Sequence, residues 1–238
     1  PGLVGIIATE SSVSNINGKK GILSYRGYSI EELAQKSTFE ETSYLLLFGE
    51  LPTSDQLKKF TSKVSQYRDL PEELVLILKA LPKHTRPMDV LQMAVSSLGT
   101  FYDLEVNPEK VKGKKYNDEY FSNTSATLIG ALGSIVAAWH RIRNGDEPIS
   151  SKPDSTYAEN FLHILGAEKI TPLMTRIMDA TLVLHGEHTI NASTFTAMVT
   201  SSTLANASQV VASAIGSLSG PLHGGANEKV IAMSVSYT

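Results

Sequence analysis

The spacing of apolar residues predicts that helices make up most of this chain. Between Pro87 and Gly99, apolar residues recur at helical intervals and share one face, which predicts an amphipathic helix. The same reasoning predicts helices over residues 30–34, 39–48, 54–67, 71–81, 118–144, 154–165 and 171–184. Two short strands, residues 4–7 and 21–24, are expected around a turn at Asn17-Gly18. The pattern therefore predicts an all-α fold with a small N-terminal β-hairpin.

Residues 193–217 have an unusual composition. Sixteen of these 25 residues are alanine, serine, threonine or glycine, and the stretch is expected to form one continuous helix. Side chains this small let two helices approach closely, which favours a central position or a subunit interface. A buried helix in a monomer is the alternative.

Charge and composition narrow the classes of partner. The chain has 238 residues, enough for one large domain or two small ones. Its net charge of −3 and isoelectric point of about 6.1 give no support for binding to nucleic acid or to a membrane surface. Cysteine is absent, which excludes disulfides, thiolate metal sites and thiol catalysis. A reducing compartment is allowed, and a cytoplasmic location is expected.

Two stretches without Lys, Arg, Asp or Glu need a separate explanation, residues 120–139 and 189–227. Both are rich in serine, threonine and asparagine, which suit a bilayer-spanning segment poorly. We therefore expect helices buried inside protein rather than membrane spans.

The segment Gly220-Pro221-Leu222-His223-Gly224-Gly225 is the strongest candidate for chemistry. Glycines beside the histidine let backbone come close to a ligand. The segment is expected to open a helix, whose first N–H groups and partial positive charge favour a bound anion. A neutral imidazole there can donate a hydrogen bond to a carbonyl or enolate oxygen. The alternative is a capping turn that happens to contain a histidine.

A second histidine segment lies upstream, His185-Gly186-Glu187-His188-Thr189-Ile190-Asn191-Ala192-Ser193-Thr194-Phe195. Together the two segments resemble citrate synthase, in which an acid-His-Glu motif running into Asn-Ala-Ser-Thr-Phe precedes Gly-Pro-Leu-His-Gly-Gly. Further segments resemble the same family in the same order: residues 1–5, 20–28, 30–34, 45–52, 86–91 and 157–162. The resemblance covers essentially the whole chain.

The resemblance implies a citrate synthase-like large domain over residues 1–219, with residues 220–238 beginning a smaller domain. It implies a homodimer or higher homo-oligomer, with the active site in the cleft between domains. It also implies the reaction, the condensation of acetyl-CoA with oxaloacetate to citrate and CoA through an enolate. Acetyl-CoA is then a substrate, and no cofactor is expected.

The resemblance also assigns roles to individual residues. His223 matches the donor that stabilises the enolate oxygen, and His188 matches the group that binds and polarises oxaloacetate. Asn191 can bond the substrate or cap the following helix, and the cap is favoured. Gly224 and Gly225 are expected to let backbone approach the substrate, with a plain turn as the alternative.

The match departs from the family beside His188. Thr189 stands where the family commonly has glutamate, Glu187 where many members have aspartate, and His185 where many have an aromatic residue. These differences affect the groups around His188 rather than the histidine itself. His185 and His188 have a spacing that can chelate a metal, but no third ligand is evident, so no metal site is expected.

Several parts of the family's site have no counterpart in these residues. The catalytic aspartate, a third histidine and most substrate-binding arginines lie later in the family. A polypeptide that truly ended at Thr238 is therefore expected to be inactive. Two other functions stay open: 2-methylcitrate synthase, which uses propionyl-CoA, and a non-catalytic helical assembly module derived from the same fold.

Overall fold

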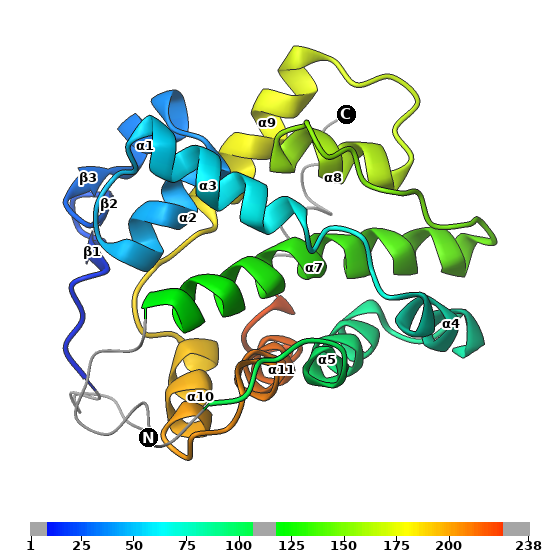
Figure 1. The fold of residues 1–238 in the computed structure, drawn as a ribbon. Helices are drawn as coiled ribbons and strands as arrows, with labels where there is room; N and C mark the ends of the chain where they lie inside the picture. Colours follow the sequence, from blue (N-terminus) through cyan, green and yellow to red (C-terminus); the bar gives the residue numbers. More distant parts are fainter. Residues whose placement is uncertain (1–8, 107–117, 226–238) are drawn as a thin grey trace. The chain divides into compact units, whose positions relative to one another are not determined.

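The computed structural model describes residues 9–106 and 118–225, without the side chain of Asp118, and it is mostly helical (Figure 1). The N-terminal elements are strands β1 (Ser14–Asn17), β2 (Ile22–Tyr25) and β3 (Tyr28–Ser29), and helices α1 (Ile30–Lys36), α2 (Phe39–Phe48), α3 (Ser54–Ser65), α4 (Glu72–Ala80) and α5 (Pro87–Ser97). A 3-10 turn, η1 (Leu98–Thr100), follows α5, and then come α7 (Asp118–Asn144), α8 (Tyr157–Leu165), α9 (Pro172–Leu184), α10 (Ala192–Ser201) and α11 (Ala207–Leu218). The predicted all-α fold with a small N-terminal sheet is confirmed.

The chain divides into two compact units. The first comprises Pro1–Phe60 and Thr171–Thr189, and the second comprises Thr61–Ile170 and Ile190–Thr238. The predicted domain boundary after residue 219 lies close to the end of the described residues, and it stays a prediction.

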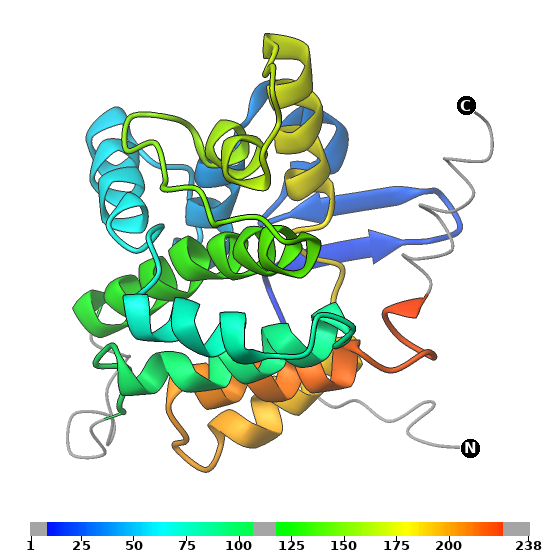
Figure 2. The ribbon, with the colours of Figure 1, turned by 90° about the vertical axis from the view of Figure 1, so that its right-hand side faces the viewer.

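The first unit contains the sheet, whose antiparallel strand order is β1-β2-β3 (Figure 2). The strand that pairs with β2 is β1. The sequence did not predict β1, because its residues are mostly polar and show no alternation of apolar positions. The predicted strand at residues 4–7 lies outside the described residues. Tyr25, at the end of β2, is fully buried with Ile30, Leu33, Leu45 and Val183. This small core joins β2, α1, α2 and α9.

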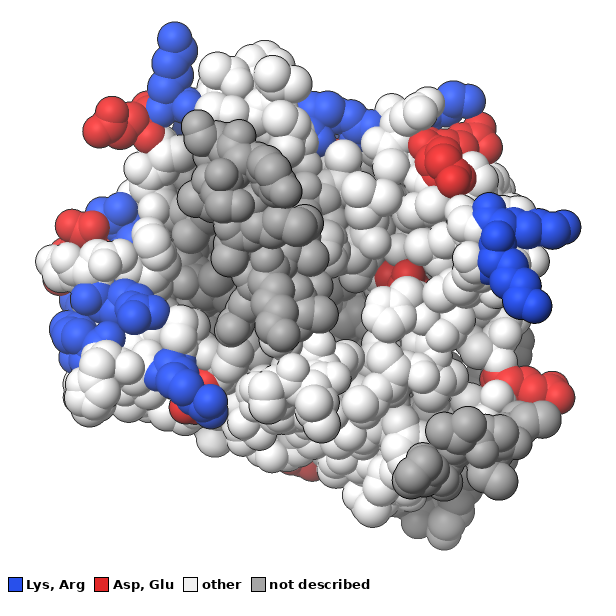
Figure 3. Space-filling model, turned by 180° about the vertical axis from the view of Figure 1, so that it is seen from behind, with Lys and Arg blue, Asp and Glu red and all other residues white. Residues whose placement is uncertain are grey.

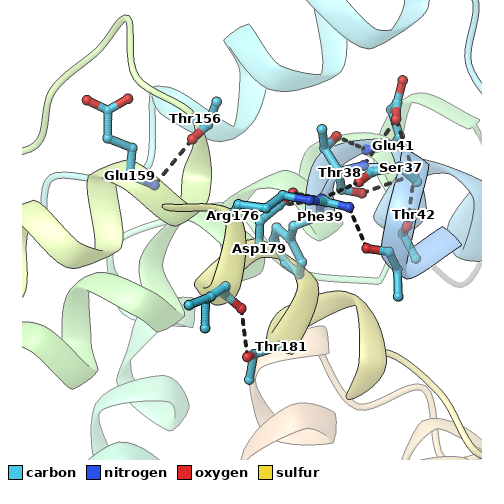
Figure 4. A network of polar contacts seen from close by, with 12 residues as sticks. Ser37, Thr38, Phe39, Glu41, Thr42, Thr156, Glu159, Arg176, Asp179 and Thr181 are labelled. Carbon is cyan, nitrogen blue, oxygen red and sulfur yellow. Dashed lines mark hydrogen bonds and ion pairs between the residues drawn. The ribbon is translucent and has the colours of Figure 1, made fainter. Parts of the chain in front are cut away.

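Two charged residues on α9 attach that helix to the connection between α1 and α2 (Figure 4). Arg176 donates from Nη1 to the Ser37 carbonyl at 3.1 Å and to Asp179 Oδ2 at 3.2 Å, and from Nη2 to the Ala34 carbonyl. Asp179 Oδ1 accepts the Phe39 N–H at 2.8 Å. Burial is the main cause that raises the pKa of Asp179, although Phe39 and Arg176 act in the opposite direction.

The second unit is built around α7. Its buried side chains, with those of α4, α5 and α11, form the larger core, which includes Leu78, Val90, Ile135, Trp139 and Ile215. Among the described residues, α7 is the helix long and apolar enough to cross a membrane, a test that buried core helices also pass. More than half of its apolar window is buried in the structure, which fits the expectation of a core helix.

The expectation of one helix over residues 193–217 is wrong. The stretch is two helices, α10 and α11, which pack against each other. Leu204 adopts a left-handed φ of 61°, which an α-helix does not contain. Asn206 then caps α11, because its side chain accepts the Gln209 N–H at 3.0 Å. Hydroxyl groups at the end of α10 also bond to preceding carbonyls, a competition with helical backbone that weakens the helix there.

Candidate functional site

The loop that carries His188 follows α9 in the first unit. The buried Tyr25 hydroxyl donates to the Val183 carbonyl at 3.2 Å and accepts the Glu187 N–H at 3.0 Å. Burial, the largest cause, raises the pKa of Tyr25, so the hydroxyl keeps its proton at neutral pH and retains both roles. Tyr25 therefore fixes the backbone just before His188.

The Glu187 carboxylate fixes the backbone just after His188. Its Oε1 accepts from Ser14 Oγ at 3.2 Å and from the Thr189 N–H. Thr189 has a φ of 79°, a left-handed conformation that a β-branched residue rarely adopts. The His188 side chain itself is exposed. The loop is thus held on both sides of a histidine whose ring is open to solvent.

The loop that carries His223 closes over the end of α11 in the second unit. The His223 N–H donates to the Gly220 carbonyl at 3.0 Å, and the Gly224 N–H donates to the Leu218 carbonyl at 3.0 Å. A Cβ on Gly224 would lie 2.3 Å from the Leu218 carbonyl oxygen. No residue except glycine fits there without a backbone shift, so the close approach at Gly224 is to the protein's own backbone.

The ring of His223 is held by a side chain from the start of α10. His223 Nε2 lies 2.8 Å from Ser193 Oγ, and Ser193 Oγ lies 2.9 Å from the Ala214 carbonyl oxygen. A hydroxyl has one proton and two acceptor positions, so Ser193 can donate to only one of these neighbours at a time. Because Nε2 is bonded to Ser193, only Nδ1 of His223 can form a hydrogen bond with a ligand.

The remaining predicted site residues lie in the second unit with His223. Asn191 caps α10, since its side chain accepts the Thr194 N–H at 2.9 Å. A Cβ on Gly225 would meet no atom of the described residues within 4 Å, its chain neighbours aside. Gly225 is helical, and the predicted continuation of that helix lies outside the described residues. Substrate contacts by Asn191, Gly224 and Gly225 stay predictions.

The second unit has a long stretch without formal charge around these residues. Residues 189–225 contain no Lys, Arg, Asp or Glu. Figure 3 shows charged side chains mostly toward the margins of the face turned to the viewer. Helices α5, α10 and α11 also line a hollow of about 470 Å³ with residues such as Met93, Thr200 and Ala212, none of which is a predicted site residue. In residues 9–106 and 118–225, no three metal-ligating side chains cluster.

Reasoning from the sequence missed two residues that hold the histidine loops, Ser193 and Tyr25. Ser193 lies inside the quoted motif, but its contact with His223 depends on how α10 packs against α11. Tyr25 lies in the Ser24-Tyr25-Arg26-Gly27-Tyr28 segment, far along the chain from Glu187. A buried tyrosine at the end of a strand was the available signal, because such hydroxyls usually have a hydrogen-bond partner.

Comparison with known proteins gives a consistent result over nearly the whole chain. Residues 2–237 match the family model described as citrate synthase, C-terminal domain. A citrate synthase from Acidithiobacillus ferridurans is 45% identical over 233 residues, which cover 98% of this chain and 60% of that protein. A 2-methylcitrate synthase from Shewanella oneidensis is 40% identical, covering 95% of this chain and 58% of that protein.

Solved structures show the same similarity. The crystal structure of citrate synthase from Pyrobaculum aerophilum has a TM-score of 0.87 and 38% identity, over 96% of this chain and 57% of that one. That of citrate synthase from Thermotoga maritima has a TM-score of 0.81 and 36% identity, over 98% of this chain and 59% of that one. The chain spans roughly three fifths of the length of these relatives.

Proposed function

The chain belongs to the citrate synthase family, and on that premise we propose that it takes part in the condensation of acetyl-CoA with oxaloacetate to give citrate and CoA. The observation that supports this most directly is the His223 ring, held at Nε2 by Ser193 in a glycine-bordered loop. A histidine fixed in this way can present Nδ1 to a ligand in one orientation.

The reaction needs a base and a hydrogen-bond donor. The base removes a proton from the methyl group of acetyl-CoA, and the donor stabilises the negative charge that develops on the thioester oxygen. The methyl carbon then attacks the ketone carbon of oxaloacetate, and water cleaves the thioester to release CoA. We assign the donor role to His223, and assign the base to no residue of this chain.

The Ser193 proton decides whether His223 can donate. When Ser193 donates to Nε2, the ring proton lies on Nδ1, and Nδ1 can donate to the enolate oxygen. When Ser193 donates to the Ala214 carbonyl, Nε2 carries the ring proton and Nδ1 can only accept. In the structure Ser193 Oγ donates to the Ala214 carbonyl at 2.9 Å. The proposed function therefore requires the hydroxyl to turn toward His223 and give up that bond.

His188 is the proposed ligand of oxaloacetate. Its side chain is exposed on a loop whose backbone is fixed on both sides. A ring N–H directed at the ketone oxygen withdraws electron density from the carbon that the enolate attacks. Because that contact strengthens as the alkoxide forms, it lowers the barrier as well as the dissociation constant.

The choice of acyl-CoA is a second question. Three of the relatives are 2-methylcitrate synthases, at 38–40% identity. The relatives at 41–45% identity are citrate synthases, which favours acetyl-CoA. Acetyl and propionyl groups differ by one methylene, for which a binding pocket discriminates by about 1–3 kcal/mol.

The test is a direct assay of the intact natural protein. CoA thiol release is measured with oxaloacetate and either acetyl-CoA or propionyl-CoA, and the product is identified by mass. We expect citrate and a higher kcat/KM with acetyl-CoA. A higher kcat/KM with propionyl-CoA supports the 2-methylcitrate alternative. Absence of thiol release with both substrates supports the non-catalytic assembly module.

We also propose that two copies associate through the uncharged helices α10 and α11. Phe195 and Val199 on α10 are exposed in the single chain, at 38% and 54%. Val199→Glu is expected to give a monomer by light scattering at micromolar concentration. Leu76→Glu, at a similarly exposed position on α4, is the matched control and is expected to leave a dimer. A monomeric natural protein contradicts this proposal.

A further inference from the structure

We propose that Tyr25 and Glu187 are positioning residues for His188, which hold the peptide groups on either side of it so that its ring is presented to the ketoacid. The inference rests on the proposed role of His188 in binding oxaloacetate. It adds two residues to that role, one of them far from His188 in the sequence.

Tyr25 acts on the N-terminal side of His188. Its side chain is 0% exposed and comes from β2, within the core of the first unit. The hydroxyl accepts the Glu187 N–H at 3.0 Å while it donates to the end of α9, at Val183. Gly186 lies close to the same core, because a Cβ there would be 3.2 Å from Leu46 Cδ1, 3.3 Å from the Val183 carbonyl oxygen and in ordinary contact with Tyr25 Cε2 at 3.5 Å. The loop is thus attached to the buried core of its unit.

Glu187 acts on the C-terminal side. One carboxylate oxygen accepts both the Thr189 N–H and the Ser14 hydroxyl, so the same group joins the loop to β1. The Thr189 N–H is directed at this carboxylate by a backbone with φ of 79°. A non-glycine residue in that region is strained and persists only where surrounding contacts hold it. The carboxylate is such a contact.

The two sets of bonds act on the residues next to His188 and leave its side chain open to solvent. Contacts that served only packing would be expected to cover the histidine as well. Here the polar groups converge on the two flanking N–H groups, those of Glu187 and Thr189. Such convergence orients the Cα–Cβ bond of His188 without occupying its ring nitrogens.

The first experiment compares two tyrosines of the same sheet in the intact natural protein. Tyr25→Phe removes only the buried hydroxyl, and Tyr28→Phe removes one from a residue that is 39% exposed. Titration calorimetry with oxaloacetate should show about tenfold weaker binding for Tyr25→Phe, the scale of one hydrogen bond of about 1.4 kcal/mol, and no change for Tyr28→Phe.

A double-mutant cycle separates positioning from general stability. On a His188→Ala background, Tyr25→Phe should weaken oxaloacetate binding no further, because the group it positions is gone. Effects of Tyr25→Phe that simply add to those of His188→Ala overturn the inference.

Glu187 supplies a second test that leaves the buried core unchanged. Glu187→Gln keeps an oxygen that can accept the Thr189 N–H, whereas Glu187→Ala removes it. We expect Glu187→Ala to weaken oxaloacetate binding and to speed hydrogen exchange at the Thr189 amide, and Glu187→Gln to retain most of both. Equal exchange rates at Thr189 in all three proteins overturn the inference.

The outcomes also separate this inference from the proposed function. If His188→Ala weakens oxaloacetate binding but Tyr25→Phe and Glu187→Ala do not, the role of His188 stands and the positioning role is wrong. If the natural protein binds no oxaloacetate, the proposed function fails, and the inference fails with it.

Discussion

The two histidine loops are held in opposite ways. In the His188 loop, the side chains of Tyr25, far along the chain, and of Glu187, within the loop, fix the backbone, and the imidazole is exposed. In the His223 loop, backbone hydrogen bonds to the end of α11 fix the chain, and a side chain holds the imidazole itself. Among the described residues, the first arrangement gives neither ring nitrogen of His188 a hydrogen-bond partner, and the second gives a partner to Nε2 of His223.

This difference suits the two proposed roles. A group that binds a ketoacid before the reaction has to admit the ligand from solvent, so an open ring on a fixed backbone is sufficient. A group that stabilises an enolate has to offer one proton at one place, so its ring and tautomer have to be fixed before the charge develops. The comparison predicts that substitutions in the His223 loop affect turnover, whereas those around His188 affect oxaloacetate binding more.

The largest expected effect comes from removing the donor. In the intact natural protein, His223→Ala should lower kcat by about 100-fold or more, the scale of losing one donor to a developing oxyanion. His188→Ala should weaken oxaloacetate binding as well as slow turnover. The two variants are compared by CoA thiol release and by oxaloacetate calorimetry. Near-normal turnover in His223→Ala would falsify the donor assignment.

The next effect tests how the His223 backbone is held. Gly224→Ala places a Cβ against the Leu218 carbonyl oxygen and forces the loop to move, whereas a Cβ at Gly225 would come within 4 Å of no other part of the described chain. Because a displacement of about 1 Å can cost about 100-fold in rate, Gly224→Ala should lower kcat at least about tenfold. Gly225→Ala should lower kcat less than Gly224→Ala, because its Cβ displaces no described group. Equal effects of the two substitutions would show that the Leu218 contact does not govern the loop.

A smaller effect is expected from the group that holds the ring. Ser193→Ala removes the hydrogen bond to Nε2 and should reduce kcat about tenfold, roughly the value of one hydrogen bond of about 1.4 kcal/mol. The matched control is Ser202→Ala, whose exposed hydroxyl bonds to the Val199 carbonyl. The pH dependence of kcat is measured for both. If Ser193→Ala has the same kcat as the control variant, the orientation of the His223 ring does not depend on Ser193.

The smallest effect concerns the attachment of α9, the helix that leads into the His188 loop. Because the pKa of Asp179 is raised on folding, the folded chain holds this proton more tightly than the unfolded chain. Its contribution to stability is therefore full below the ordinary pKa of 3.8 and is lost as the pH rises through the raised value. Urea unfolding of the natural protein and of the Asp179→Asn variant, at several pH values between acid and neutral, measures how the free energy of unfolding of each depends on pH.

Asp89 is the control of opposite sign. A hydrogen bond from Arg86 lowers the pKa of Asp89, so its contribution is present above 3.8 and is lost as the pH falls through the lowered value. Asp89→Asn should thus change the pH dependence of stability in the reverse direction. The same direction for both variants contradicts the burial of Asp179 as the dominant cause.

Local signals in the sequence predicted much of the helical structure. The boundaries of α2 and α9 were predicted closely, because Gly49 ends one helix in a left-handed conformation and Thr171 caps the other. Where several capping residues adjoin, the prediction was less accurate. The helix predicted from residue 154 begins at Tyr157 instead, because Thr156 rather than an earlier polar residue caps α8.

The site was predicted only as far as local motifs reach. The motifs identified His188, Asn191 and His223 as candidates, and the cap at Asn191 follows from its place before a helix. The contacts made by Tyr25 with Glu187 and by Ser193 with His223 depend on tertiary packing, which residue spacing does not encode. The left-handed Thr189 was also unpredictable, because intrinsic preferences disfavour it.

The break between α10 and α11 has a geometric consequence for the His223 ring. As a single helix, residues 193–217 would place Ser193 about 36 Å from Ser217, at a rise of about 1.5 Å per residue. Because the chain turns at residues 202–206, the two helices lie together, and Ser193 Oγ is 2.8 Å from His223 Nε2. The turn is far along the chain from both residues, yet its length sets which residue of α10 lies beside the histidine.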